Sequence, residues 1–260
     1  MNRLATLFSS SSGNCTLVCN EDTNILIDAG VSATGIISAL KDFDLDICEI
    51  DGILVTHEHT DHIKAVCGLS RKYNIPVYAN SATMAEIIAY GGDLHDRNIC
   101  VISNGKDFGI RSMNVVPFSI PHDAVDPLGF TVNLGDSYVS VATDTGHITK
   151  SMLLHMSKSE AVVIESNHDV DMVKNGKYPY YLKRRILSDN GHLSNENAAW
   201  MATQLALWGT KKIILGHLSD HNNLPQRAYE VADKKLRENK IIPNSDVILK
   251  VASKNQPCIL

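Results

Sequence analysis

The sequence predicts an α/β protein whose two halves each combine several strands with helices. Strand-length apolar or alternating runs occur early in the chain, at about residues 3–8, 15–19, 24–28 and 51–56. Strand patterns dominate again from about residue 99 to 143, and helices alternate with strands after that. Two βββα-like halves pack better as one αββα unit than as separate domains. We therefore expect a single domain over residues 1–260, without a linker.

Helices are predicted where an apolar periodicity follows a strand. They run over about residues 32–41, from after Asp61-His62 to about Tyr73, from Ser81 onward, from Ser194 to about Trp208, and over about 225–239. Ser81 and Ser194 are the expected N-caps of two helices, because a serine hydroxyl accepts a hydrogen bond from a first-turn amide. Asn197 takes the place that a glutamate would occupy in a capping box.

Several of the remaining strands end at residues that can do chemistry. Strands are expected at residues 75–78, 161–164, 212–216 and 246–250, the last of them being the final strand. Asp28, Glu165 and His217 each come at or directly after the end of a predicted strand. Residues 134–137 carry the turn residues of a hairpin.

Composition and charge are those of a globular protein with a sizeable core. Hydrophobic residues make up 44% and charged residues 20% of the 260 residues. The net charge of −5 counts mildly against a nucleic-acid partner, although a local basic strip or bound metals can hold phosphates. The six cysteines form no CxxC pair, so we expect buried thiols in the reducing cytoplasm. We expect no membrane partner, because no secretory signal or membrane-spanning segment is evident.

The most informative segment places four metal-ligand side chains in six consecutive positions, directly after the apolar run 53–55. They are His57, His59, Asp61 and His62. Alternation along a strand would send the first three the same way, and a following helix would bring His62 back to them. Such ligands suit Zn²⁺, Mn²⁺ or Fe, and two ligand pairs can serve two ions. A His-rich surface loop is the alternative, but it rarely shows this order of ligands.

Residues 57–62 read HEHTDH and match the HxHxDH signature of the metallo-β-lactamase superfamily. This resemblance implies an αββα sandwich of two mixed β-sheets, with helices outside and metals at one edge. Three later segments resemble the remaining ligand motifs of the family, in family order. They are residues 119–122 (SIPH), 141–146 (VATDTG) and 214–219 (ILGHLS).

The resemblance also implies seven ligands for two divalent ions, Zn or Mn, with Fe possible. His57, His59 and His122 would bind the first ion, Asp61, His62 and His217 would bind the second, and Asp144 would bridge them. Carboxylates can span two cations about 3.5–4 Å apart. A water between the ions would lose a proton near neutral pH, and the bridging hydroxide would attack phosphorus or a carbonyl carbon.

Residues 8–14 (FSSSSGN) and 216–223 (GHLSDHNN) are similar to the YycJ/WalJ-like group of this superfamily. Members of that group are bacterial hydrolases regarded as DNA-processing enzymes with 5′→3′ exonuclease activity, so the resemblance implies a DNA substrate. Residues 191–194 (GHLS) and 164–167 (IESN) resemble RNase Z more distantly. In RNase Z the histidine lies on the other side of the glutamate, whereas here His168 follows Glu165.

Two residues are the candidate catalytic groups. By its RNase Z-like context, His192 would protonate the leaving group, and the alternative is a helix-start residue bonded to the backbone. Asp61 is the second, in addition to being a ligand. Asp28 would orient a ligand histidine or the 57–62 loop.

The candidate substrate contacts are Ser11, Ser12, Asn14, His168 and Asn222. The serine-rich segment can offer hydroxyls and amides to a phosphate, or it is only a turn between strands. His168 would contact a phosphate or would support the ligands. The cluster Lys183-Arg184-Arg185 would track a nucleic-acid backbone, or it is a solvated helix face.

The sequence thus predicts a dinuclear metal-dependent phosphodiesterase that acts on DNA as an exonuclease. The same ligands would serve a hydrolase of small phosphodiesters, esters, lactones or thioesters, which the acidic net charge favours. A non-catalytic regulatory protein is a third possibility, against which the complete ligand set argues.

Overall fold

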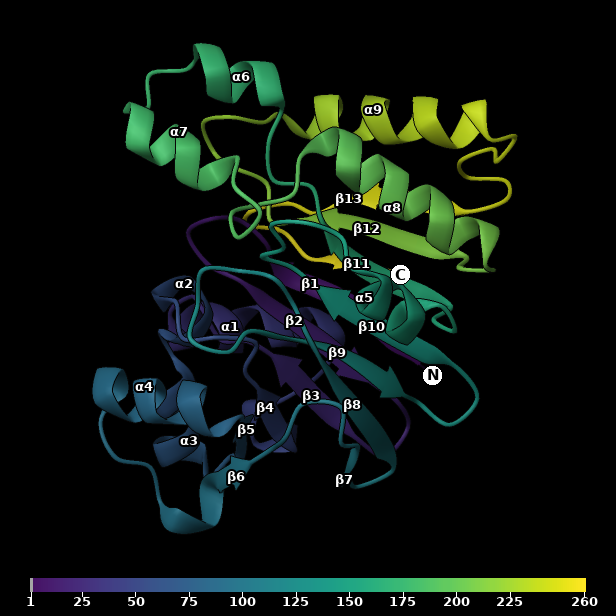
Figure 1. The fold of residues 1–260 in the computed structure, drawn as a ribbon. Helices are drawn as coiled ribbons and strands as arrows, with labels where there is room; N and C mark the ends of the chain where they lie inside the picture. Colours follow the sequence, from purple (N-terminus) through teal and green to yellow (C-terminus); the bar gives the residue numbers. More distant parts are fainter. Residues whose placement is uncertain (1) are drawn as a thin grey trace.

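The computed structural model describes residues 2–260 as two β-sheets that face each other, with helices over their outer faces (Figure 1). The strands of the first sheet are β1 (Arg3–Phe8), β2 (Cys15–Cys19), β3 (Asn24–Ile27), β4 (Gly52–Leu54), β5 (Val77–Ala79), β6 (Ile99–Val101) and β14 (Cys258–Ile259). Those of the second are β7 (Phe108–Ile110), β8 (Met113–Ser119), β9 (Leu128–Asn133), β10 (Tyr138–Ala142), β11 (Ala161–Glu165), β12 (Lys212–Gly216) and β13 (Ile248–Val251).

Both sheets are mixed. The first has the order β14-β1-β2-β3-β4-β5-β6 and the second β13-β12-β11-β10-β9-β8-β7. Strands β3 to β6 are parallel to one another, as are β10 to β13, whereas β1–β2 and β8–β9 pair antiparallel. The expected αββα sandwich of two mixed sheets is confirmed.

The helices are α1 (Ala33–Leu40), α2 (Thr60–Ile63), α3 (Val66–Tyr73), α4 (Ser81–Gly91), α5 (Lys150–Met156), α6 (Val170–Asn175), α7 (Tyr180–Ile186), α8 (Asn195–Leu207) and α9 (Pro225–Glu238). Apolar residues of α1, α3 and α4 pack on the first sheet, and those of α5, α8 and α9 pack on the second. Among residues 2–260, no helix is long and apolar enough to span a bilayer.

The central core lies between the two sheets, and it explains why the inner strands lack polar alternation. Ile25 and Ile27 of β3 face this core together with Phe130 and Val163 of the second sheet. Leu26, between them in sequence, faces the helix layer instead, because successive side chains of a strand point to opposite faces. Both faces of β3 are covered, so a continuous apolar run forms the strand.

Several predicted boundaries were wrong for identifiable reasons. The N-cap of α4 is Asn80, whose side chain accepts a hydrogen bond from the Thr83 amide at 2.9 Å, and Ser81 is the first helical residue. The predicted helix from residue 62 to 73 is two helices, α2 and α3, separated at 64–65. The strand at 248–251 is not the last, because β14 follows it and pairs with β1.

Candidate metal centre

The predicted ligands and Asp28 lie at one edge of the sandwich, where the parallel strands end. Asp28 follows β3, Asp144 lies two residues beyond β10, and His217 follows β12. All three have a left-handed backbone, with φ of 63°, 58° and 54°. A non-glycine residue rarely adopts this conformation unless the surroundings enforce it, and such residues gather at functional sites.

The 57–62 loop leaves its strand earlier than expected. β4 ends at Leu54, so the argument from alternating strand positions for the direction of His57 and His59 was wrong. The Thr56 amide donates to the Asp28 carboxylate at 2.8 Å instead of to a neighbouring strand, and the chain turns there. Helix α2 then begins at residue 60, so His62 is helical as expected, whereas Asp61, which was expected on the strand, is also in the helix.

Three histidine nitrogens form the first group of possible ligands. His57 Nε2 and His122 Nε2 lie 3.1 and 3.3 Å from His59 Nδ1. The other ring nitrogens of two of them are fixed: His57 Nδ1 lies 2.9 Å from the Thr56 hydroxyl, and His122 Nδ1 lies 3.0 Å from the Gly191 carbonyl oxygen. Such hydrogen bonds set the tautomer and the orientation of a ligand imidazole.

Asp61, His62 and His217 form the second group. Asp61 Oδ2 lies 3.6 Å from His62 Nε2 and 3.7 Å from His217 Nε2. The Nδ1 atom of each imidazole contacts a buried carboxylate. His62 Nδ1 lies 2.7 Å from Asp28 Oδ2, and His217 Nδ1 lies 2.7 Å from Glu165 Oε1. Asp28 therefore contacts His62, one of the predicted ligands, through the ring nitrogen that does not face Asp61.

Asp144 lies between the two groups. Its Oδ2 is 3.2 Å from His62 Nε2, and its Oδ1 is 3.7 Å from His122 Nε2. The contact between Asp144 Oδ2 and His62 Nε2 is an ion pair and not a hydrogen bond. Asp144 Oδ2 and His217 Nε2 are both buried, and neither makes a hydrogen bond. A buried polar atom without a partner costs about 1–3 kcal/mol. Both atoms fit a metal ion, which would satisfy them.

The carboxylates and imidazoles of the centre shift one another's pKa values. Burial raises the pKa of Asp144, but the charges of His217 and His62 outweigh it and hold this pKa well below the usual range. Burial lowers the pKa of His217, but Asp144, Asp61 and Glu165 raise it to about 10. Burial and the charge of His62 hold the pKa of His57 well below its usual value. The carboxylates thus stay ionised and attract cations, which divalent ions would supply in place of protons.

Glu165 is the functional residue that the sequence interpretation left without a role. It is fully buried, and its Oε1 lies 2.8 Å from His192 Nδ1 and 2.7 Å from His217 Nδ1. Its Oε2 accepts the amides of Thr145 at 2.7 Å and Leu193 at 3.0 Å. These partners overcome burial and lower its pKa to about 2. The available signal was a carboxylate at the end of the apolar strand AVVIE, where it must be paired.

His192 lies outside both groups of three, but with Asp144, Glu165 and His217 it forms a further cluster whose ligand atoms lie within 4.8 Å of one another. Its ring centre is 5.1 Å from that of His122 and 5.4 Å from that of His217, and its side chain is 16% exposed. Its Nδ1 is engaged by Glu165, so Nε2 is the nitrogen that can exchange a proton with a substrate. The His192 side chain thus contacts the Glu165 carboxylate. The alternative from the sequence was a residue at a helix start that hydrogen-bonds to the backbone.

The serine-rich segment contacts the centre through Asn14 and Ser9. Two of its predicted residues, Ser11 and Ser12, do not make such contacts. Asn14 Nδ2 lies 3.0 Å from His62 Nε2, so this predicted residue is at the site. Ser11 and Ser12 lie in an exposed turn, where the Ser12 hydroxyl pairs with that of Ser10. Ser9, which was not predicted, accepts the His217 amide at 2.7 Å.

His168 and Asn222 lie in two loops joined by the Asp169 amide, which donates to the Asn222 carbonyl oxygen at 2.9 Å. Both side chains are buried, and His168 Nδ1 and Asn222 Nδ2 make no hydrogen bond. Burial lowers the pKa of His168 to about 4. A neutral, buried ring fits a supporting role better than a cationic contact to phosphate.

Gly30 allows the loops that contain Asn14, Gly30 and Asp61 to pack closely beside the centre. The Gly30 amide donates to the Asn14 carbonyl oxygen, and the Asn14 amide donates to the Asp61 carbonyl oxygen, both at 2.8 Å. A Cβ atom at Gly30 would lie 1.5 Å from the Asp61 carbonyl oxygen. Only glycine permits this approach, which fixes the second group of ligands against the first sheet.

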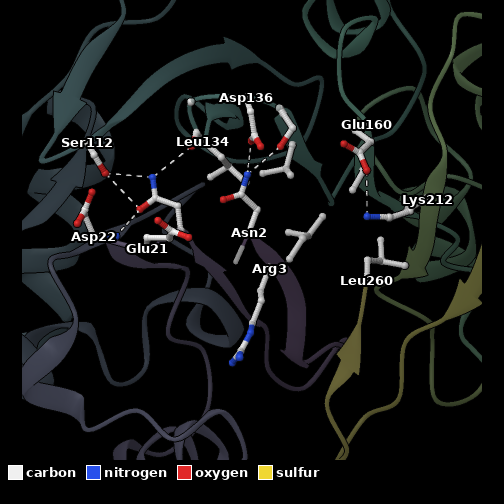
Figure 2. Close-up of a pocket in the computed structure, with 16 residues that line it drawn as sticks. Asn2, Arg3, Glu21, Asp22, Ser112, Leu134, Asp136, Glu160, Lys212 and Leu260 are labelled. Atoms are coloured by element: carbon white, nitrogen blue, oxygen red, sulfur yellow. Dashed lines mark hydrogen bonds and ion pairs between the residues drawn. The ribbon is translucent and has the colours of Figure 1, made fainter.

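A cavity of about 630 Å³ lies at the opposite edge, where β11 and β12 begin (Figure 2). The polar residues in it largely pair with one another. Glu160 and Lys212 form an ion pair at 3.0 Å, and Asn2 bonds to the Asp136 side chain. These contacts tie strands and turns of both sheets together, far from the ligand cluster.

Comparison with known proteins gives a consistent result. Residues 23–218 match a family model described as a beta-lactamase superfamily domain. The chain is 38% identical over 234 residues to "Exodeoxyribonuclease YycJ" of Bacillus anthracis, covering 89% of this chain and 88% of that protein. It is 37% identical over 225 residues to "Exodeoxyribonuclease WalJ" of Streptococcus pneumoniae, covering 86% and 84%.

Solved structures agree on the fold alone. The metallo-beta-lactamase fold protein YhfI from Bacillus subtilis superimposes with a TM-score of 0.73 at 14% identity, covering 100% of both chains. Zn²⁺-bound PqqB from Methylobacterium extorquens gives a TM-score of 0.68 at 13% identity, covering 98% of this chain and 99% of that one.

Proposed function

The chain belongs to the beta-lactamase superfamily, and we propose that within it the protein is a metal-dependent hydrolase of DNA that acts as a 5′→3′ exonuclease. The observation that carries the proposal is the meeting of two groups of three ligands, with Asp144 in contact with both. The choice of DNA rests on relatives at 37–38% identity that are named exodeoxyribonucleases.

We assign His57, His59 and His122 to one divalent ion, Asp61, His62 and His217 to a second, and Asp144 to both. Zn²⁺ and Mn²⁺ suit these nitrogen and oxygen ligands, and Fe is also possible. When bound, such ions would activate water near neutral pH and neutralise charge on the phosphate oxygens.

The remaining residues would position these ligands and move a proton. Asp28 would hold His62, and Glu165 would hold His217 and His192 through contacts of 2.7–2.8 Å. His192 would donate a proton from Nε2 to the departing oxygen, since its other nitrogen is engaged.

We treat residues 1–260 as one functional domain, because each group of ligands draws on both sheets. His57 and His59 follow β4 of the first sheet, whereas His122 follows β8 of the second. We assign the activity to the cytoplasm, since all six cysteines are free, as is usual in a reducing compartment.

Cleavage of labelled DNA tests the proposal. With added Mn²⁺, 5′-labelled DNA should release its label as mononucleotide from the start of the reaction. Single-stranded and duplex substrates are compared with a small phosphodiester and a thioester under the same conditions. The net charge of −5 favours a small substrate as the second candidate. Brisk turnover of the thioester, with no DNA bound or cut at low salt, would show that the protein is a small-molecule hydrolase and not a nuclease.

The salt dependence of DNA binding tests which residues contact phosphates. The logarithm of the DNA-binding constant falls linearly with the logarithm of the salt concentration. Changing Lys183 and Arg184 together to Ala should make this slope less steep by about 0.7–0.9 for each phosphate that these side chains neutralise. Arg185 is left unchanged, because it pairs with Asp123 beside a ligand histidine. Turnover of a small phosphodiester should stay the same.

The matched control changes Lys158 and Lys234, two exposed lysines after α5 and in α9, to Ala. It removes the same charge at other places on the surface. An equal flattening by both double variants would show that net charge, and not contact at α7, sets the slope.

A further inference from the structure

A basic and aromatic surface lies outside the metal centre, on α6 and α7. We call it the α6–α7 platform, and it consists of Lys174, Tyr180, Tyr181, Lys183 and Arg184. Tyr180 and Tyr181 are 75% and 73% exposed, more than any other large hydrophobic side chain in the described part of the chain. A hollow of about 520 Å³ is lined by Lys174, Tyr180, Lys183, Arg184 and Leu187.

The platform is strongly positive in a protein that is negative as a whole. Residues 172–188 contain five basic residues (Lys174, Lys177, Lys183, Arg184 and Arg185) and no acidic residue, whereas the chain carries −5. Among the ion pairs of residues 2–260, only Arg185 of these five takes part, with Asp123. The Lys183 ammonium donates to the Lys174 carbonyl oxygen at 2.8 Å, and the Arg184 guanidinium lies 6.0 Å from the Tyr180 ring centre. These charges are therefore available to an anionic partner.

The platform is attached directly to the metal centre. The Ile186 carbonyl oxygen at the end of α7 accepts the His192 amide at 3.1 Å. A Cβ atom at Gly191 would lie 2.4 Å from the same oxygen, so only glycine lets the chain before His192 fold against α7. With a rise of 1.5 Å per residue, Tyr180 lies about 9 Å along the helix from Ile186. In Figure 1, α7 and α2 both lie at the left of the view.

A second contact fixes the other end of the platform. The Tyr178 ring packs edge-on against His221 with 5.7 Å between ring centres, and Gly176 lies close to the Asn222 side chain. Both partners belong to the loop that follows the ligand His217. The platform is thus held by the segments on both sides of the centre, which fits a surface that guides a substrate to it.

We propose that the α6–α7 platform binds an unpaired stretch of the DNA strand beside the scissile bond. Bases stack on Tyr180 and Tyr181, and the phosphates pair with Lys174, Lys183 and Arg184. This inference rests on the proposed function. Exposed aromatic rings accept any base, and basic side chains between them hold the backbone, as in other single-strand binding surfaces. Base pairs in a duplex hide their faces from such rings, so the platform favours a single strand or a frayed end.

The stacking is tested with the metal-loaded enzyme and a single-stranded oligonucleotide. The variant Tyr180→Ala with Tyr181→Ala should weaken binding of the strand by about 10–100-fold. Turnover of a small phosphodiester and the metal content should match the unchanged protein. The control Tyr90→Ala removes a tyrosine on α4 that is 52% exposed, and it should leave DNA binding unchanged. Phenylalanine at both platform positions should restore the affinity, because it keeps the rings.

Abasic sites in the oligonucleotide identify the contact from the substrate side. For the unchanged enzyme, an abasic site at the nucleotides that stack should weaken binding about tenfold. The same abasic site should have no further effect on the double Ala variant, because the ring that it faced is gone. Equal losses in both proteins, or no dependence on position in the unchanged enzyme, would overturn the proposal.

The two proposals fail in different ways. If the unchanged protein cuts DNA but the double Ala variant binds and cuts single strands equally well, the platform is not a DNA surface, and an acidic protein segment becomes the better occupant. If the unchanged protein neither binds nor cuts DNA, the proposed function itself is wrong.

Discussion

Replacement of Asp144 by Ala is expected to remove both metal ions and to lower DNA cleavage by at least about 10³-fold. Its carboxylate lies within 3.7 Å of a ligand nitrogen from each group of three. One substitution therefore deprives two ions of a ligand and of their shared negative charge. The measurement is elemental analysis of the gently purified variant together with its cleavage rate.

His217→Ala is the matched control, because His217 belongs to the second group of three and not to the first, although its Nδ1 also lies 3.4 Å from Asp144 Oδ1. Its Nε2 lies 3.7 Å from Asp61 Oδ2, and it makes no contact of this kind with His57 or His59. The variant should lose mainly one ion and keep the other. The unchanged protein should hold about two ions per chain. Full occupancy and activity in Asp144→Ala would exclude the bridging assignment, and a protein that takes up no metal at all would exclude metal catalysis.

The residues that meet at the centre were easier to predict from the sequence than the contacts that support them, and the reason is distance along the chain. His57 to His62 form one local motif, and His122, Asp144 and His217 come one to three residues after the ends of β8, β10 and β12, where position alone suggests a meeting point. Glu165 contacts His192 and His217, which are 27 and 52 residues away, so its double role depends on the order of β11 and β12 in the sheet. No local pattern carries that order.

The same limit explains the missed elements of the fold. Helix α7 is short and basic, so it has little apolar periodicity, and its exposed tyrosines give no sign of a buried face. Strand β14 has two residues, and it forms only because it pairs with β1, which lies at the other end of the sequence. Ser81 and Asn80 are both good caps, and backbone geometry at the turn decides between them.

Replacement of His192 by Ala should leave both ions in place and slow cleavage by about 10²–10⁴-fold, the usual value of general acid help. His192 also belongs to a further cluster of possible ligands with Asp144, Glu165 and His217, but it is outside the two groups of three to which we assign the ions. Its Nδ1 is engaged by Glu165 at 2.8 Å, so the metal content should persist. Metal analysis and kcat on DNA measure the two halves of this expectation. Loss of an ion would make His192 a ligand.

Glu165→Gln separates positioning from proton transfer. Because Glu165 holds both His192 and His217, this variant should lose rate and also bind metal more weakly, whereas His192→Ala should lose rate alone. About 10–100-fold weaker metal binding is typical when such a supporting carboxylate is changed. Equal metal affinity in both variants would mean that Glu165 does not hold His217 in a way that matters to the ion.

The leaving group decides whether His192 acts as an acid. A nitrophenolate departs without a proton, whereas the alkoxide of a nucleotide needs one, so His192→Ala should slow a nitrophenyl phosphodiester much less than DNA. Glu165 fixes Nδ1 and leaves Nε2 as the nitrogen that can carry this proton, so the geometry makes the difference between the two substrates the expected signature. Equal losses on both would mean that His192 only positions the substrate, and the proton would then have to come from water or from another group near the metal centre.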